Sequence, residues 1–127
     1  MEQYITLVFM ETKTIKGTDL KYRVEINCSG LDVSVDRVEC TVVGGGTSLP
    51  IPPLGEQADL EHDARTLYNE EEENVLYICF NTSIFPNTSL HLIVKAFVPD
   101  EDFPDGFRTE IAKTKLCDLY PPTQQIV

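Results

Sequence analysis

The stretch from Leu20 to Cys28, LKYRVEINC, decides the fold class of this chain. Its apolar residues occupy every second position and alternate with charged or polar residues such as Lys21, Arg23 and Glu25. A period of two is the period of a β-strand, because successive side chains of a strand point to opposite faces of the sheet. The stretch therefore predicts a strand with one face in the core and the other in solvent.

Four further segments are rich in β-branched and aromatic residues and predict additional strands. These segments are Tyr4 to Met10, Arg37 to Val43, Val75 to Asn81 and Leu90 to Phe97. Turn-forming residues separate them, as in Ser29-Gly30 and Pro104-Asp105-Gly106. Short strands with such turns indicate an all-β fold, an antiparallel sandwich.

The connection between Gly44 and Glu73 is long, and its second half shows a different pattern. In EQADLEHDARTLY, residues 56–68, four apolar residues fall on one face of a helix: Leu60, Ala64, Leu67 and Tyr68. We therefore predict one short helix in this crossing loop.

Size and charge limit the functions that this chain can have. Its 127 residues, of which 42% are hydrophobic, fit a single domain that spans residues 1–127. The 21 acidic and 10 basic residues give a net charge of -11, which disfavours binding to nucleic acid or to a bare anionic membrane. We expect a partner that is neutral, basic or bridged by a cation.

Neither a membrane span nor an intact secretory signal is predicted. The chain has no apolar run long enough to cross a bilayer, and its first residues carry no basic segment that leads into an apolar stretch. We therefore expect a cytoplasmic location.

The residues that usually carry catalysis or bind metals form no recognisable pattern. The four cysteines lack a C-x-x-C pair, and the two histidines, His62 and His91, have no nucleophile at a recognisable spacing. We predict that the chain is not an enzyme, and we assign no catalytic residue. Two disulfides and four free thiols are both compatible with the sequence, which contains Cys28, Cys40, Cys79 and Cys117.

An alternative interpretation is an extracellular immunoglobulin-like or receptor-type sandwich that binds a protein ligand. Asn27, Asn81 and Asn87 each begin a glycosylation acceptor pattern. In addition, Tyr77-Ile78-Cys79 matches the tyrosine corner of immunoglobulin domains, with Cys28 as the expected partner of that cysteine. The chain has no Trp, which such domains bury in their core.

The order of segments resembles a C2 domain over nearly the whole chain. Residues 4–9 and 16–26 look like the first two strands of that family, and CFNTSIFPNTSLHLIVKAF, residues 79–97, is similar to its pair of strands joined by a short loop. VPDEDFPDGFRTEIAKTKLCDLY, residues 98–120, resembles the acidic third loop, a Gly-containing strand and the closing L-x-D-L. The resemblance implies an eight-stranded antiparallel sandwich whose end loops bind Ca²⁺ and phospholipid in some members and proteins in others.

The calcium ligands that the resemblance implies are only partly present. Asp19 matches the aspartate at the start of the second strand, whereas Ala96 and Val98 stand where two aspartates of the third loop are expected. Carboxylates follow a few residues later. If Ca²⁺ binds, the implied ligands are Asp19, Asp100, Asp102 and Asp105. We therefore expect no obligatory cofactor and no membrane binding, unless Ca²⁺ forms the bridge.

Our leading hypothesis is a C2-like, calcium-independent, non-enzymatic module that binds a protein partner and forms part of a larger protein. The acidic loop is its predicted binding loop, and such a loop would suit a basic partner. The predicted binding residues are Asp100, Glu101, Asp102 and Asp105.

Overall fold

The structure, a computed structural model, describes residues 3–8, 13–28, 38–53, 55–68 and 75–121. These residues form nine β-strands and no helix, so the all-β prediction is confirmed. The strands are β1 (Gln3–Val8), β2 (Lys13–Ile15), β3 (Asp19–Cys28), β4 (Val38–Gly44), β5 (Thr47–Ile51), β6 (Arg65–Tyr68), β7 (Val75–Asn81), β8 (Ser89–Pro99) and β9 (Phe107–Tyr120). No helix in this described part could cross a membrane.

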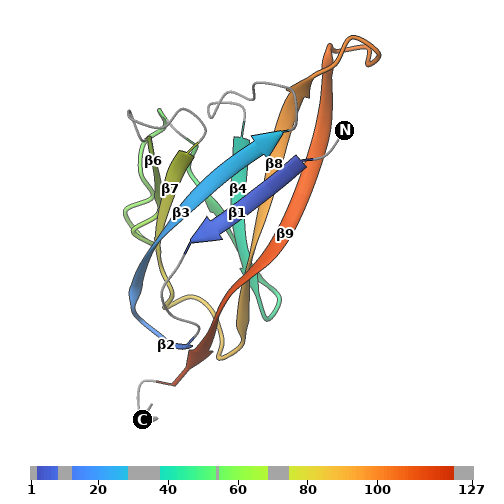
Figure 1. The fold of residues 1–127 in the computed structure, drawn as a ribbon. Coiled ribbons are helices and arrows are strands. Elements are labelled where there is room, and N and C mark those ends of the chain that lie inside the picture. The colour runs from blue at the N-terminus through green and yellow to red at the C-terminus, as the bar shows by residue number, and fades with distance from the viewer. Residues whose placement is uncertain (1–2, 9–12, 29–37, 54, 69–74, 122–127) are drawn as a thin grey trace.

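The strands form two sheets (Figure 1). One has the order β1-β3-β7-β6 and the other has the order β2-β9-β8-β4-β5. Neighbouring strands run antiparallel, except that β2 runs parallel to β9. The expected antiparallel sandwich is thus found in its main features, with nine described strands in place of eight and one parallel pair.

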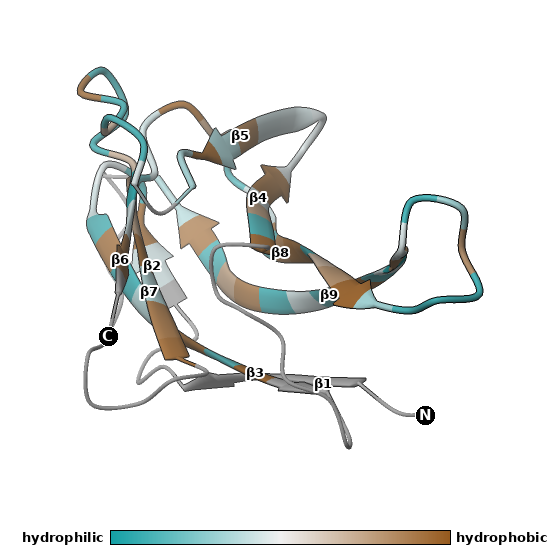
Figure 2. Cartoon of the chain, turned by 90° about the horizontal axis from the view of Figure 1, so that it is seen from above, coloured by the Kyte–Doolittle hydropathy of each residue, from teal (hydrophilic) through white to brown (hydrophobic). Residues whose placement is uncertain are grey.

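The alternating pattern in the sequence places the core between the sheets. In β3, the side chains of Tyr22, Val24 and Ile26 are at most 3% exposed. In β8, every second side chain from Leu90 to Val98 is at most 1% exposed. Figure 2 shows β3 in one layer and β4, β8 and β9 in the other, with hydropathy alternating along β8 and β9. The apolar faces of the two sheets therefore cover each other and are removed from water.

The predicted helix in residues 56–68 is wrong, because this segment forms a tight turn followed by β6. Asp59 and Ala64 exchange two backbone hydrogen bonds of 2.8 and 2.9 Å. Leu60, which the helical pattern placed on the apolar face, is 78% exposed at the tip of the turn. Among the members of that face whose side chains are described, only Ala64 is fully buried.

Local hydrogen bonds explain why the turn replaces the helix. Asp59 Oδ1 accepts hydrogen bonds from the backbone N–H groups of Glu61 and His62, at 3.1 and 3.3 Å. Such side-chain contacts compete with helical backbone bonds. Asp63 has a positive φ of 52°, a conformation that ends a helical path. The chain then enters β6, which pairs with β7 and extends the sheet.

Candidate functional site

The predicted binding loop connects β8 to β9 and lies at the tip of a hairpin. This hairpin extends beyond the other strands, at the upper right in Figure 1. Two consecutive turns shape the loop: Phe103 N donates to Asp100 O at 3.3 Å, and Gly106 N donates to Phe103 O at 2.9 Å. The second turn ends on Gly106, whose φ of 83° favours glycine. The turn expected at residues 104–106 is confirmed.

An ion pair fixes the base of this loop. Arg108 Nη1 donates to Asp100 Oδ2 at 2.7 Å, and Arg108 Nε donates to Glu110 Oε1 at 3.1 Å. The other oxygen of Asp100 accepts the backbone N–H of Asp102 at 3.0 Å. The Asp102 N–H and the Arg108 guanidinium together lower the pKa of Asp100. Asp100 is therefore an ionised carboxylate whose two oxygens already have donors.

The remaining carboxylates of the loop face solvent. Glu101, Asp102 and Asp105 are all exposed, and Asp105 Oδ1 accepts the backbone N–H of Phe107 at 3.1 Å. Between them lies Phe103, whose side chain is 44% exposed. We call Glu101, Asp102, Phe103 and Asp105 the acidic tip. It presents negative charge and one aromatic ring on a loop that turns and an ion pair hold in shape.

Asp19, the fourth implied calcium ligand, lies far from the acidic tip. It is the first residue of β3 and is paired with Asn81, whose Nδ2 donates to Asp19 Oδ1 at 2.8 Å. The preceding turn joins the opposite end of β9, since Lys16 N donates to Tyr120 O at 2.9 Å. From Phe107 to Tyr120, β9 extends for roughly 40 Å. The three loop aspartates of the implied ligand set share one loop, but in the described residues their carboxylate oxygens do not all lie within 4.8 Å of one another, and Asp19 lies at the other end of β9.

A different cluster, which the sequence analysis did not identify, lies in the turn before β6. Ligand-type atoms of Asp59, Glu61 and His62 lie within 4.8 Å of one another. His62 Nδ1 is 2.7 Å from Asp59 Oδ2, and this contact raises the pKa of His62 and lowers that of Asp59. The D-x-E-H spacing was visible in the sequence, but the helical interpretation placed these residues differently. Asp59 uses both oxygens to hold the turn, which explains the cluster without a metal ion.

The immunoglobulin-type disulfide does not fit this fold. Cys40, Cys79 and Cys117 form no disulfide. Cys79 in β7 lies opposite Lys21 in β3. Lys21 is seven residues from Cys28 along β3, so Cys79 and Cys28 lie roughly 23 Å apart. A disulfide requires Cα atoms within about 7 Å, so Cys28 and Cys79 cannot be joined.

The thiols also lack the character of a nucleophile. Burial raises the pKa of Cys40 to about 12, and desolvation raises the pKa of Cys79 and Cys117 as well. A thiol of this kind stays protonated at neutral pH, whereas a reactive cysteine requires the thiolate.

The three glycosylation patterns have different surroundings. The amide nitrogen of Asn81 donates to Gly17 O at 3.0 Å as well as to Asp19, so both of its hydrogens are used in the fold. Asn87 is exposed in the connection between β7 and β8. The side chain of Asn27 lies outside the described residues.

Comparison with known proteins found no protein-family model that matches this chain, and no curated protein matches it.

Proposed function

We propose that this chain is a C2-like, non-enzymatic interaction module of a larger cytoplasmic protein, and that it binds a basic protein partner through the acidic tip without Ca²⁺. The observation that supports this most directly is the shape and chemistry of the hairpin. Its tip extends from the sandwich and exposes Phe103 among three carboxylates.

The fixed base of the loop favours binding. The Arg108–Asp100 ion pair and the two turns hold the tip in one shape before a partner arrives, which reduces the entropy lost on association. Exposed aromatic rings often supply the central contact of an interface. The surrounding carboxylates would accelerate encounter with a positively charged partner.

The binding prediction can be tested with peptides selected from a random library displayed on phage. We expect a class of basic peptides whose affinity falls about tenfold in Glu101→Gln/Asp102→Asn, because two exposed charge pairs contribute up to about 1 kcal/mol each. Glu56→Gln/Asp63→Asn is the matched control, since it removes the same charges from exposed positions elsewhere. The proposal fails if no basic class is selected, or if both double variants weaken binding equally.

Calcium independence gives a second test, by thermal unfolding with Ca²⁺ or with a chelator. A Ca²⁺ site at 100 times its Kd would add about 2.7 kcal/mol and raise the Tm by roughly 10 °C. We expect a change below about 1 °C, because Arg108 already neutralises Asp100 and Asp19 lies at the other end of the fold. A large rise that disappears in Asp100→Asn/Asp102→Asn would contradict the proposal and identify a calcium site.

A further inference from the structure

Among the residues that the structure describes, one edge of β9 has no strand partner over much of its length. On one side β9 pairs with β8, from Phe107 to Asp118. On the other side, among the described residues, only Asp118 to Tyr120 pair, with the short β2. The nearest strand of the other sheet, β1, pairs with β3 and not with β9. We call residues 109–115 the β9 edge; its outward N–H and C=O groups could pair with another strand.

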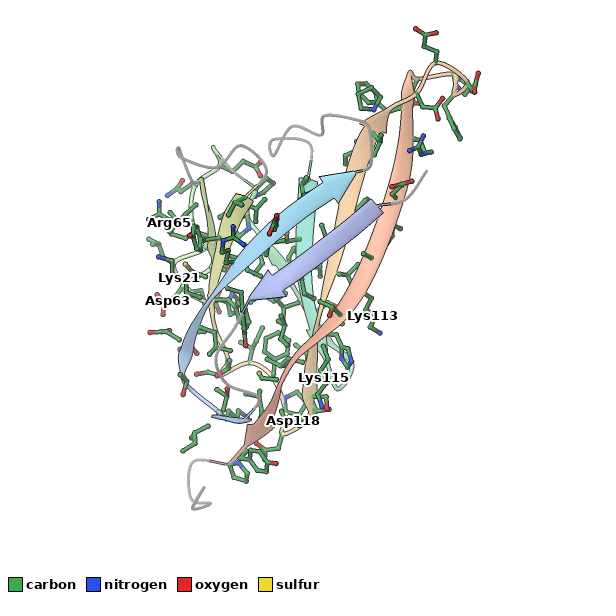
Figure 3. The ribbon with its side chains drawn as sticks, in the orientation of Figure 1. Lys21, Asp63, Arg65, Lys113, Lys115 and Asp118 are labelled. Carbon is green, nitrogen blue, oxygen red and sulfur yellow. The ribbon has the colours of Figure 1, made fainter. Side chains whose placement is uncertain are left out.

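The exposed side chains of the β9 edge are Thr109, Ile111, Lys113 and Lys115, which carry positive charge, in contrast to the net charge of -11 of the whole chain. Glu110, the acidic residue of this segment, is half-buried and pairs with Arg108. Ile111 is 63% exposed, which is unusual for an apolar residue in the middle of a strand. Lys95 lies opposite Ile111 on β8, and Lys113 follows two residues later on the same face. Figure 3 shows Lys113 and Lys115 extending from β9 into solvent.

Two of these lysines form no ion pair with an acidic residue of the described part. Lys115 pairs with Asp118 at 3.0 Å, but neither Lys95 nor Lys113 lies within 4.0 Å of a carboxylate in the described part of the chain. Glu39 is the cross-strand neighbour of Lys95 on β4, and it forms no ion pair with it. The face around Ile111 therefore carries positive charge that a partner could neutralise.

The acidic tip does not cancel this charge. Lys113 and Gly106 are seven residues apart along the hairpin, or roughly 23 Å. Interactions between exposed charges are screened over about 8 Å at physiological ionic strength. The two ends of the hairpin thus act as separate electrostatic surfaces.

From these observations we propose that the β9 edge accepts an extended acidic segment of a partner protein as an added strand. On the face that carries Ile111 and Lys113, alternate side chains of this segment would be an apolar residue beside Ile111 and a carboxylate beside Lys113. Lys95 lies one strand further away, on β8, and adds positive charge to this face. Backbone pairing supplies affinity, and the side chains supply selectivity. Lysines on an edge strand disfavour pairing between like-charged strands, so they select an acidic segment. This inference concerns a second surface, beyond the acidic tip.

The same displayed library tests the inference. We expect a second class of peptides, acidic and with alternating apolar residues, that binds about tenfold more weakly to Lys95→Gln/Lys113→Gln. The matched control is Lys21→Gln/Arg65→Gln, which removes two exposed cations from the opposite sheet (Figure 3). Glu101→Gln/Asp102→Asn should leave the affinity of the acidic peptides unchanged. The two double variants therefore distinguish a failure of the proposal for the acidic tip from a failure of the proposal for the β9 edge.

Amide hydrogen exchange with the best acidic peptide distinguishes strand addition from contact with the sheet face. Added backbone pairing should slow exchange of alternate amides in residues 109–115. Four results would overturn the inference: no acidic class, equal loss of binding in the matched control, unchanged exchange at the β9 edge, or a Lys95- and Lys113-dependent dimer of this chain. Binding to phosphatidylserine vesicles with the same lysine dependence, in place of peptide binding, would also overturn it.

Discussion

Replacing Phe85 by alanine is expected to lower the free energy of unfolding by about 3–5 kcal/mol. Phe85 lies in the turn between β7 and β8, and its side chain is 0% exposed. Its ring packs edge-on against Phe80 with centroids 6.4 Å apart, and Phe80 stacks on Tyr22 at 6.2 Å. Truncation would remove the end of this aromatic row and leave a cavity between the sheets, because packed strands relax only partly around a void.

Urea unfolding monitored by circular dichroism measures this loss as a lower midpoint. Ile84→Ala is the control, because Ile84 is the preceding residue and is 36% exposed. It should cost well under half as much, since less apolar surface is buried there. Comparable losses for the two variants, or a loss below about 1 kcal/mol for Phe85→Ala, would show that the turn is not packed against the core as described.

Local patterns predicted the strands that have one clearly buried face. The alternation in β3 and β8 appears directly in the sequence, because the strand period is a property of consecutive residues. The burial of Phe85 could not be predicted in this way. The sequence marks residues 85–87 as a turn, and a turn is packed on the core only when two sheets close over it.

In residues 56–68, by contrast, a local pattern predicted a helix that does not form. Leu60, Ala64 and Leu67 have helical spacing, but spacing does not show whether Asp59 will hydrogen-bond to the next backbone amides. That local competition, together with an available edge of β7, produced a turn and β6. A short segment with few apolar residues does not bury enough surface to favour the helix.

Only the part of the candidate site that is local in the sequence could be predicted. Its turn residues and carboxylates are consecutive, so the acidic tip could be located from the sequence. The Arg108–Asp100 ion pair depends on the hairpin register, in which Arg108 lies opposite Val98. The β9 edge depends on which strands pair in space. Neither follows from a local pattern.

Replacing Thr82 by valine should lower the free energy of unfolding by about 1–3 kcal/mol, although the two side chains have the same shape. Thr82 is 0% exposed. Its Oγ1 donates to Thr18 O at 3.0 Å and accepts from Gly17 N at 2.9 Å. Valine would leave the Gly17 N–H without its acceptor, and it would remove one of the links that hold the turn before β3 against the end of β7.

Thr82→Ser separates the hydroxyl from the methyl group in this prediction. Serine keeps both hydrogen bonds and loses only one methyl group, which corresponds to about 1 kcal/mol or less. Chemical unfolding of the two variants should therefore place valine below serine in stability. Amide exchange should quicken at Gly17 in the valine variant alone, because its N–H loses the acceptor. If serine proves the less stable of the two, methyl burial rather than the hydroxyl holds these turns together, and the assigned role of Thr82 is wrong.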